Sequence, residues 1–415
     1  MRKHGGLAIV YGRRRVGKTT LLRRWLRGEE AACLTQAIEA SPKIQLAHLC
    51  GELGRQFDFP AQPQSWTELF ALMDRVPGRN IVVLDEFPYL VVCDPSLPSV
   101  IQRWFDHRQN RGLLVVLSGS SSTIMTNAAL TAEAALFGRA SVVLSVRPMK
   151  YASFCQALRV VPTRPDAFER FALTGGVPRY WEILRLHRCK DGVAAAEALF
   201  FGSNALLEGE PRRVLSDERI EGISAISVLE AIGRGAARPS EIAGRIGIAQ
   251  TALSKTIELL TSIGLVARDT PFGISPRDSK KSNYRIADPC LRFWFSTYSP
   301  HRGRWATFSR PDKQALVSQH VGHVFEDVVR EHFVGSSRYW EPNVEFDAVM
   351  ATSSRELVVV EVKWRKLTAV ERRSIVDDIA RRFARCRLAK SYSLADIRVV
   401  DQSNLGELST SVSKG

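Results

Sequence analysis

The first 150 residues alternate short, continuously apolar runs with longer segments that mix apolar and polar positions. Five of the short runs have the length of a strand: GLAIVYG, AACLTQ, NIVVLDE, GLLVVLSGS and ASVVLSV. Continuous apolar runs separated by helix-length crossovers are typical of strands that are buried on both faces. The pattern therefore predicts an α/β domain with a parallel sheet in residues 1–150.

The pattern changes after this domain. Residues 151–220 have the periodicity of helices, and residues 221–298 contain three helical segments followed by two strand-like ones. The helical segments are SAISVLEAIGRG, PSEIAGRIGI and AQTALSKTIELLTSIG, and the strand-like segments are LVARDTP and SNYRIAD. Three helices with a two-stranded hairpin predict a winged-helix domain, a form of helix-turn-helix.

The remaining chain is predicted to hold a linker, a last domain and a tail. Residues 299–313 are rich in Pro, Gly, Arg and Ser, a composition typical of a linker. Residues 314–403 predict the last domain. Residues 404–415 predict a tail that frays.

Composition narrows the classes of function. The chain has 415 residues, 45% hydrophobic and 24% charged, which is ordinary for a globular protein of more than one domain. No apolar run has the length of a membrane span. Seven scattered cysteines without CxxC spacing favour a reducing cytoplasm over a disulfide framework or a zinc site. The net charge of +15 favours a polyanionic partner, nucleic acid before a membrane surface.

A phosphate-binding loop follows the first strand. GRRRVGKT, residues 12–19, has the G-x-x-x-x-G-K-[ST] pattern between a predicted strand and a predicted helix. Its glycines allow backbone N–H groups to surround phosphates at the positive end of the helix. Lys18 would bind the β- and γ-phosphates of ATP, and the Thr19 hydroxyl would coordinate Mg²⁺. The predicted nucleotide-binding residues of this segment are Gly12, Arg13, Arg14, Arg15, Val16, Gly17, Lys18, Thr19 and Thr20.

Further candidate residues lie near the ends of other predicted strands. Asp85 and Glu86 follow four apolar residues at the carboxyl edge of the sheet, where open α/β sheets bind ligands. Asp85 would hold Mg²⁺ through its water shell, and Glu86 would act as general base toward the attacking water. Ser118 and Ser120 would sense the γ-phosphate or only form a turn. Arg139 would stabilise transferring phosphate, in cis or in a neighbouring subunit, or be a surface residue.

These motifs belong to a recognisable set. YGRRRVGKTTLL, VVLDEFPYL, LSGSSSTIM, LFGRASVVLSVRPM and ALTGGVPRYWE together resemble the archaeal-type AAA+-related ATPase family, which also occurs in bacteria and is related to the STAND NTPases. The resemblance implies the strand order 5-1-4-3-2 and a helical lid in residues 151–220. It places Pro178, in the Gly-Gly-x-Pro segment, near the base and sugar of the nucleotide. It leaves open whether the arginines before Lys18 contact nucleotide, DNA or another domain.

One feature departs from the family. Its members carry a segment before the first strand that helps to enclose the base, whereas the first strand here begins within ten residues of Met1. The resemblance therefore implies either a truncated start or a weakened recognition of the base.

The resemblance extends toward the carboxyl end. DPCLRFWFSTYSP and FEDVVREHF are similar to the family segments that join the winged helix to a nuclease-like domain of the PD-(D/E)xK type. In RELVVVEVKWRK, Glu361 and Lys363 lie two apart on one strand face. Asp347 ends an earlier strand that a hairpin would bring alongside, and Glu326 lies on a preceding helix.

These four residues predict a second site. Glu326, Asp347 and Glu361 would bind Mg²⁺, and Lys363 would position or deprotonate a water that attacks a phosphodiester. A solvated strand face produces the same E-x-K spacing, and such domains also bind DNA without cutting it.

The third helix of the predicted winged helix has two distinct sides. Thr251, Ser254, Lys255 and Glu258 lie away from its apolar side, which is the arrangement of a recognition helix in the major groove. The predicted phosphate contacts of the following loop are Arg277, Lys280, Lys281 and Arg285. A module that contacts protein is the alternative.

Together these features predict a cytoplasmic, Mg²⁺-dependent ATPase that binds DNA. Cleavage of DNA and formation of an oligomer stay open. The alternative is a regulator or adaptor in which ATP controls assembly without significant turnover or nuclease activity.

Overall fold

The computed structural model describes residues 5–59, 62–108, 112–120, 122–220, 223–275, 277 and 281–409. The chain forms two compact units. The first unit comprises Met1–Pro148 and Val214–Ile220, and the second comprises Met149–Arg213 and Glu221–Gly415. The first unit is therefore discontinuous in the sequence. Among the described helices, none is both long enough and apolar enough to cross a membrane.

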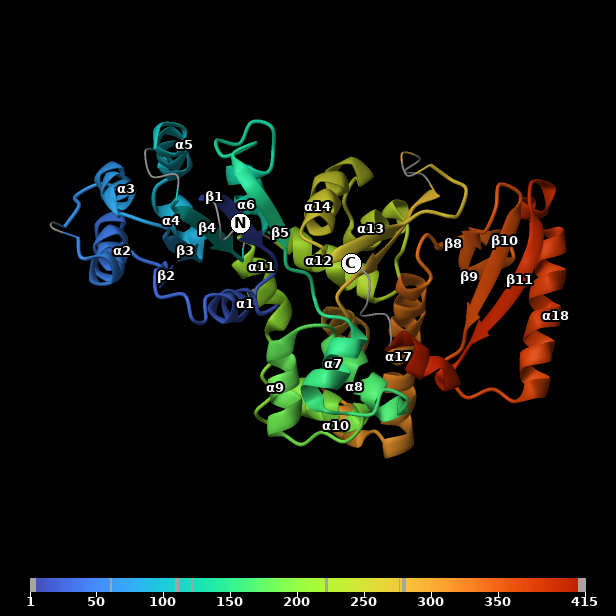
Figure 1. The fold of residues 1–415 in the computed structure, drawn as a ribbon. Helices are drawn as coiled ribbons and strands as arrows, with labels where there is room; N and C mark the ends of the chain where they lie inside the picture. Colours follow the sequence, from blue (N-terminus) through green and yellow to red (C-terminus); the bar gives the residue numbers. More distant parts are fainter. Residues whose placement is uncertain are drawn as a thin grey trace. The chain divides into compact units, whose positions relative to one another are not determined.

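A five-stranded parallel sheet forms the centre of the first unit (Figure 1). Its strands are β1 (Gly6–Tyr11), β2 (Ala32–Gln36), β3 (Ile81–Asp85), β4 (Leu114–Gly119) and β5 (Ala140–Ser145). The order across the sheet is β2-β3-β4-β1-β5, which confirms the predicted order 5-1-4-3-2. All five strands lie in the apolar runs from which they were predicted. The central strands β3 and β4 are buried along their whole length, as predicted, whereas the edge strand β5 is mostly exposed in spite of its apolar sequence.

Six helices of the first unit accompany this sheet. They are α1 (Lys18–Trp25), α2 (Pro42–Phe57), α3 (Trp66–Arg75), α4 (Phe87–Cys93), α5 (Leu97–His107) and α6 (Ser122–Ala129). Apolar side chains of β1, β3 and β4 pack with α2–α6 in the larger core, and Leu22 of α1 packs in a smaller one. The helices α1 and α4 begin directly beyond the carboxyl ends of β1 and β3, so the polar residues between strand and helix lie at one edge of the sheet.

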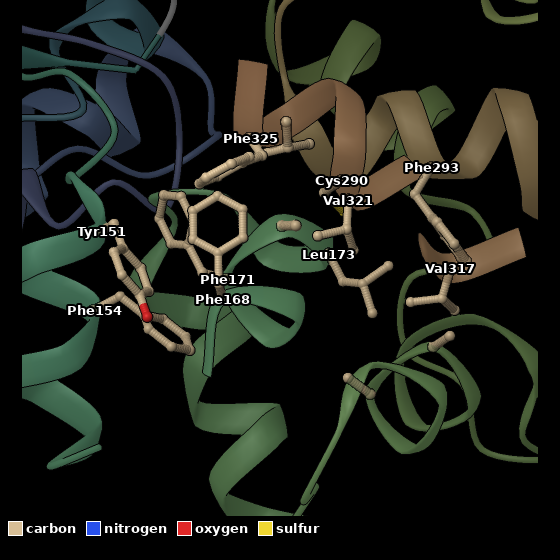
Figure 2. Packing of buried hydrophobic residues seen from close by; sticks show 14 of the residues in the cluster. Tyr151, Phe154, Phe168, Phe171, Leu173, Cys290, Phe293, Val317, Val321 and Phe325 are labelled. Carbon is tan, nitrogen blue, oxygen red and sulfur yellow. The ribbon is translucent and has the colours of Figure 1, made fainter. Parts of the chain in front are cut away.

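Helices form the core of the second unit. They are α7 (Tyr151–Leu158), α8 (Pro165–Thr174), α9 (Pro178–Leu186), α10 (Gly192–Ala196), α15 (Pro289–Phe293) and α17 (Arg310–His332), while α11 (Glu210–Asp217) ends in the first unit. Figure 2 shows Phe168 of α8 among aromatic side chains of this core. The ring of Phe168 contacts Tyr151 of α7 and Phe325 of α17, with ring centroids 5.0 and 5.3 Å apart. Helices distant in the sequence therefore share one core.

Residues 223–286 fold as three helices and a hairpin. The elements are α12 (Ile223–Gly233), α13 (Pro239–Ile246), α14 (Gln250–Ser262), β6 (Val266–Asp269) and β7 (Asn283–Ile286). The strands β6 and β7 pair antiparallel. Leu253, Ile257 and Leu260 of α14 are buried, which agrees with the apolar side predicted for this helix.

The last part of the second unit is a mixed four-stranded sheet with two helices. Its strands are β8 (Ser337–Glu341), β9 (Val344–Ala351), β10 (Glu356–Val362) and β11 (Ser393–Val400), in the order β11-β10-β9-β8. The strands β8, β9 and β10 are antiparallel neighbours, and β11 joins β10 in parallel after the crossover helix α18 (Ala369–Arg385). Helix α17 precedes this sheet, and α18 packs on β11 (Figure 1).

The prediction that residues 299–313 form a linker is wrong for most of this segment. The short helices α16 (Ser299–His301) and η4 (Trp305–Thr307) occupy it, and α17 begins at Arg310. Trp305 is buried and stacks on Phe201 with ring centroids 3.9 Å apart. Pro311 stands in the first turn of α17, where a missing N–H costs nothing, whereas Pro300 lies near the end of the continuous helical run α15–η3–α16. Neither proline of this segment therefore stands in a loop.

The predicted fraying of residues 404–415 is wrong for its first part. Helix α19 (Leu405–Leu408) places Leu405 and Leu408 in the core of the second unit. Residues 410–415 of that prediction lie outside the described residues.

Candidate nucleotide-binding site

The backbone of residues 12–17 forms a tight loop between β1 and α1. Gly12 has a φ of 152°, and a Cβ atom at this position would lie 2.2 Å from the carbonyl oxygen of Val146. Gly17, at the start of α1, has a φ of 99°. Such conformations are open to glycine and strained for other residues. Arg15, with a φ of 71°, is the exception within the loop. The two glycines of the motif are therefore required by the shape of the loop.

Lys18 is buried beneath this loop. Its Nζ donates hydrogen bonds to the carbonyl oxygens of Gly12 at 2.7 Å and Arg13 at 3.1 Å. Burial lowers the pKa of Lys18, and the nearby carboxylates of Glu86 and Asp85 oppose this effect. A buried ammonium that is held by two backbone carbonyls is available to exchange them for phosphate oxygens.

Thr19, the second residue of α1, contacts Asp85, the last residue of β3. The Thr19 hydroxyl donates to Oδ2 of Asp85 at 2.6 Å. A hydroxyl and a carboxylate at this position fit Mg²⁺, which is usually held by one or two protein oxygens together with substrate phosphates and water. The predicted pair is therefore brought together by the parallel strands.

Glu86 directly follows β3 in a left-handed backbone conformation, with φ 53° and ψ 39°. This conformation is uncommon for a residue other than glycine and costs about 1–3 kcal/mol. One carboxylate oxygen of Glu86 accepts a hydrogen bond from the Ser120 hydroxyl at 2.7 Å. Ser118, on β4 two residues before Ser120, is fully buried, and its hydroxyl has no hydrogen-bond partner among the described residues. Both predicted serines thus lie at this edge of the sheet, and Ser120 contacts the predicted base.

A further carboxylate pair reaches the loop from a distant part of the sequence. The guanidinium of Arg14 forms an ion pair with Asp217, the last residue of α11, although 203 residues separate them. Glu218 is 4% exposed, and its charge acts on Lys18. Both acids belong to the first unit. Sequence reasoning missed them, because nothing in LSDERI distinguishes them from other surface acids.

The other predicted nucleotide-site residues are less closely involved. Val16 is buried in the loop, Thr20 is exposed on α1, and Arg13 stays a prediction. Arg139 forms a two-point ion pair with Asp106 of α5, at 2.9 and 2.8 Å, which would have to open before Arg139 met phosphate. Pro178 is the first residue of α9 in the second unit, where its role toward the nucleotide stays a prediction.

The four predicted residues of the second site converge within the second unit. Asp347 of β9 accepts a hydrogen bond from the backbone N–H of Val362 at 2.7 Å, and Lys363 donates to Glu361 of β10 at 2.8 Å. Burial and the charge of Asp347 raise the pKa of Glu326, on α17, to about 7. Burial and the same charge raise the pKa of Glu361. Helix α17 and the β9–β10 hairpin thus bring these side chains together, and their role as a site stays a prediction.

Basic side chains face the carboxylates of this second site, where the binding of Mg²⁺ stays a prediction. Lys363 and Arg382 both face Glu361, the latter at 3.7 Å, and Arg338 lies 3.6 Å from Glu326. In the described parts of the chain, no group of three or more His, Cys, Asp and Glu side chains is arranged to hold a metal ion. The carboxylates instead share a network with basic side chains.

The candidate DNA-contacting residues divide into two groups. Thr251, Ser254, Lys255 and Glu258 are exposed along α14, and Arg277 and Lys281 are exposed in the hairpin loop. Lys280 lies outside the described residues. Arg285 of β7 does not fit its predicted role, because it pairs with Asp269 at 3.0 Å and with Asp327 of α17 at 2.9 Å. Arg285 therefore links the hairpin to α17, and its partner is the carboxylate of Asp327 and not a DNA phosphate.

Comparisons with known proteins agree with the geometry of the first unit. Residues 4–155 match a family model described as an AAA domain, and residues 306–375 match a model for archaea bacterial proteins of unknown function. An uncharacterized protein of Methanocaldococcus jannaschii is 24% identical over 391 residues, which cover 90% of this chain and 86% of that protein. A Walker-type ATPase of Pyrococcus abyssi has a similar structure, with a TM-score of 0.53 and 18% identity over 70% of this chain and 90% of that one. The domain match supports an AAA-type, nucleotide-binding ATPase, and the solved structure shares its fold.

Proposed function

We propose that the protein is a Mg²⁺-dependent ATPase whose nucleotide cycle is coupled to DNA binding. The observation that carries the ATPase proposal is the contact of Thr19 with Asp85 directly beside the loop that buries Lys18. Lys18 and Thr19 are the first residues of α1, Asp85 is the last residue of β3, and they meet where phosphates would lie against the start of α1. The AAA-domain match over residues 4–155 supports the same reading.

Each group at this site has a defined task in hydrolysis. Lys18 would exchange its two carbonyl partners for phosphate oxygens, and Thr19 and Asp85 would hold Mg²⁺. The ion would supply positive charge beside the phosphates. Glu86 would accept a proton from the attacking water, and the Ser120 hydroxyl would hold one of its oxygens in place meanwhile.

The coupling to DNA rests on the second unit. Three helices followed by a hairpin support a winged-helix reading of residues 223–286, with the exposed polar side of α14 as the recognition surface. The net charge of +15 favours a polyanion. Hydrolysis assayed with and without duplex DNA tests the coupling, because DNA-stimulated turnover supports it and unchanged turnover contradicts it.

A second candidate function is a nucleotide-switched regulator. One observation favours it: Ser120 donates to Glu86 and Lys18 donates to backbone, so both groups are restrained by the protein itself. A regulator would bind Mg-ATP tightly, change its assembly or its DNA affinity, and hydrolyse the nucleotide slowly. Tight nucleotide binding without turnover, in the presence of DNA, would favour this alternative.

The ion pair of Arg14 leads to the first prediction. Asp217 places negative charge beside the loop, and bound nucleotide would add more. Asp217→Asn should therefore bind ATP about five-fold more tightly, since a unit charge at close range is worth about 1 kcal/mol in water. Titration calorimetry measures the change. Asp58→Asn, at an exposed aspartate of the same unit, is the control and should not change affinity. Weaker binding in Asp217→Asn would contradict this prediction and would mean that the ion pair holds the loop in its binding conformation.

The second site leads to another prediction. Because Glu361 faces Lys363 and Arg382, we expect its domain to contact DNA without cutting it. Wild type and Glu361→Ala should leave supercoiled, linear and single-stranded DNA equally intact with Mg²⁺ or Mn²⁺, as measured on gels. Both should keep ATP hydrolysis, which the first unit supplies. Metal-dependent cleavage by wild type that Glu361→Ala loses would restore the predicted nuclease site.

A further inference from the structure

Four arginines line one cavity among the helices of the second unit. The cavity has a volume of about 510 Å³ and lies where the ends of α7 and α9 approach α8. Arg159 caps α7, Arg170 lies on α8, Arg185 stands in the last turn of α9, and Arg188 follows that helix. The other lining residues are alanine, leucine and cysteine, so none of the described residues that line this cavity is acidic.

The positive charge of this arginine cavity is only partly balanced. Arg170, whose side chain is 12% exposed, pairs with Asp166 at 3.2 Å and also donates to the carbonyl oxygen of Cys189. Asp166 is itself shared with Arg164. Within the part of the chain that the structure describes, Arg159, Arg185 and Arg188 form no ion pair. Among the described residues, these three guanidinium groups thus have no carboxylate partner.

Two of these arginines also have an unusual backbone. Arg159 and Arg188 have φ values of 53° and 49°, at helix ends where glycine is the common residue. Bulky residues in this conformation are uncommon, and such positions are frequent at functional sites. The negative end of a helix attracts cations, which accounts for an arginine at each end. This attraction does not explain why Arg170, on the neighbouring helix α8, lines the same cavity.

We propose that the arginine cavity binds phosphate groups, as a site separate from the phosphate-binding loop. Guanidinium groups bind phosphate oxygens through paired N–H bonds, and several of them together select an anion with more than one phosphate. The volume is within the range of small-ligand sites. The phosphates come from a free polyphosphate or from the backbone of a nucleic acid.

The test uses the full chain carrying Lys18→Ala, which removes binding at the phosphate loop. Calorimetry with inorganic tripolyphosphate should show one saturable site. Arg159→Gln with Arg188→Gln should weaken it at least ten-fold, and Arg185→Gln alone should weaken it less. The control is Arg179→Gln, because Arg179 lies on α9 outside the cavity and pairs with an exposed glutamate. Thermal melting of each variant shows that folding is retained.

A second arm identifies the source of the phosphates. The same variants are titrated with a duplex DNA at several salt concentrations. If DNA is the source, the double variant should lose affinity, and its salt slope should fall by about two, at about 0.9 per phosphate contact. Tripolyphosphate binding that depends on the arginines, without a change in DNA affinity, supports a free polyphosphate. If the double variant changes neither binding relative to Arg179→Gln, the proposal is wrong.

Discussion

Lys18→Ala is expected to abolish nucleotide binding. The Lys18 ammonium is buried under the loop and bonded to two backbone carbonyls, so it is placed to transfer to phosphate without a rearrangement of the chain. Hydrogen bonds to charged groups are worth about 1.5–3 kcal/mol each, and the loss of two predicts an affinity at least about 100-fold lower. Titration calorimetry with Mg-ATP measures the change.

The control for this change is Lys43→Ala, which removes an exposed lysine from α2 of the same unit. It should leave nucleotide affinity as in wild type. Thermal melting without nucleotide separates lost binding from lost folding, because alanine leaves the carbonyls of Gly12 and Arg13 without their partner. A folded Lys18→Ala protein that binds ATP like wild type would remove the phosphate-loop assignment.

Glu86→Gln is expected to separate binding from hydrolysis. An amide has the size of the carboxylate and can still accept the hydrogen bond of Ser120, but it cannot accept a proton from water. Loss of a general base lowers the rate about 10²- to 10⁴-fold, while Lys18, Thr19 and Asp85 continue to hold Mg-ATP. Phosphate release in a single turnover gives the rate, and calorimetry gives the affinity.

The matched change for Glu86 is Glu39→Gln, at an exposed glutamate of the first unit. It should alter neither rate nor affinity. Should Glu86→Gln hydrolyse ATP at the wild-type rate, another group activates the water, and Glu86 is only the first residue of the turn into α4.

The phosphate loop and its sheet could be predicted because their signals are local. Each buried strand is a continuous apolar run, and parallel strands must end at one edge, so Thr19 and Asp85 could be placed together from their positions alone. Asp217 could not, because its link to Arg14 arises only when α11 returns to the first unit. A contact across 203 residues leaves no periodicity or spacing in the sequence.

The incorrect predictions have a common physical cause. Composition reports which residues a segment contains, but not whether its neighbours bury them. The Pro- and Gly-rich stretch 299–313 belongs to a core because Trp305 is buried there. The predicted tail belongs to the same core because Leu405 is buried. The prediction for Arg285 failed for the same reason. A basic residue in the hairpin of a winged helix suggests a contact with phosphate, but Arg285 pairs with Asp327 instead. In each case the deciding partner lies on another element.

The discontinuity of the first unit has a consequence for synthesis of the chain on the ribosome. The phosphate-binding loop emerges before Asp217, which follows Arg14 by 203 residues. At about 5–20 residues per second, the loop waits about 10–40 s for this carboxylate. During that time β1–β5 can already pair, but Arg14 has no Asp217 to meet, and residues 149–213 of the second unit emerge first. The nascent loop should therefore meet cellular ATP before the acidic residues that later lie beside it have been made.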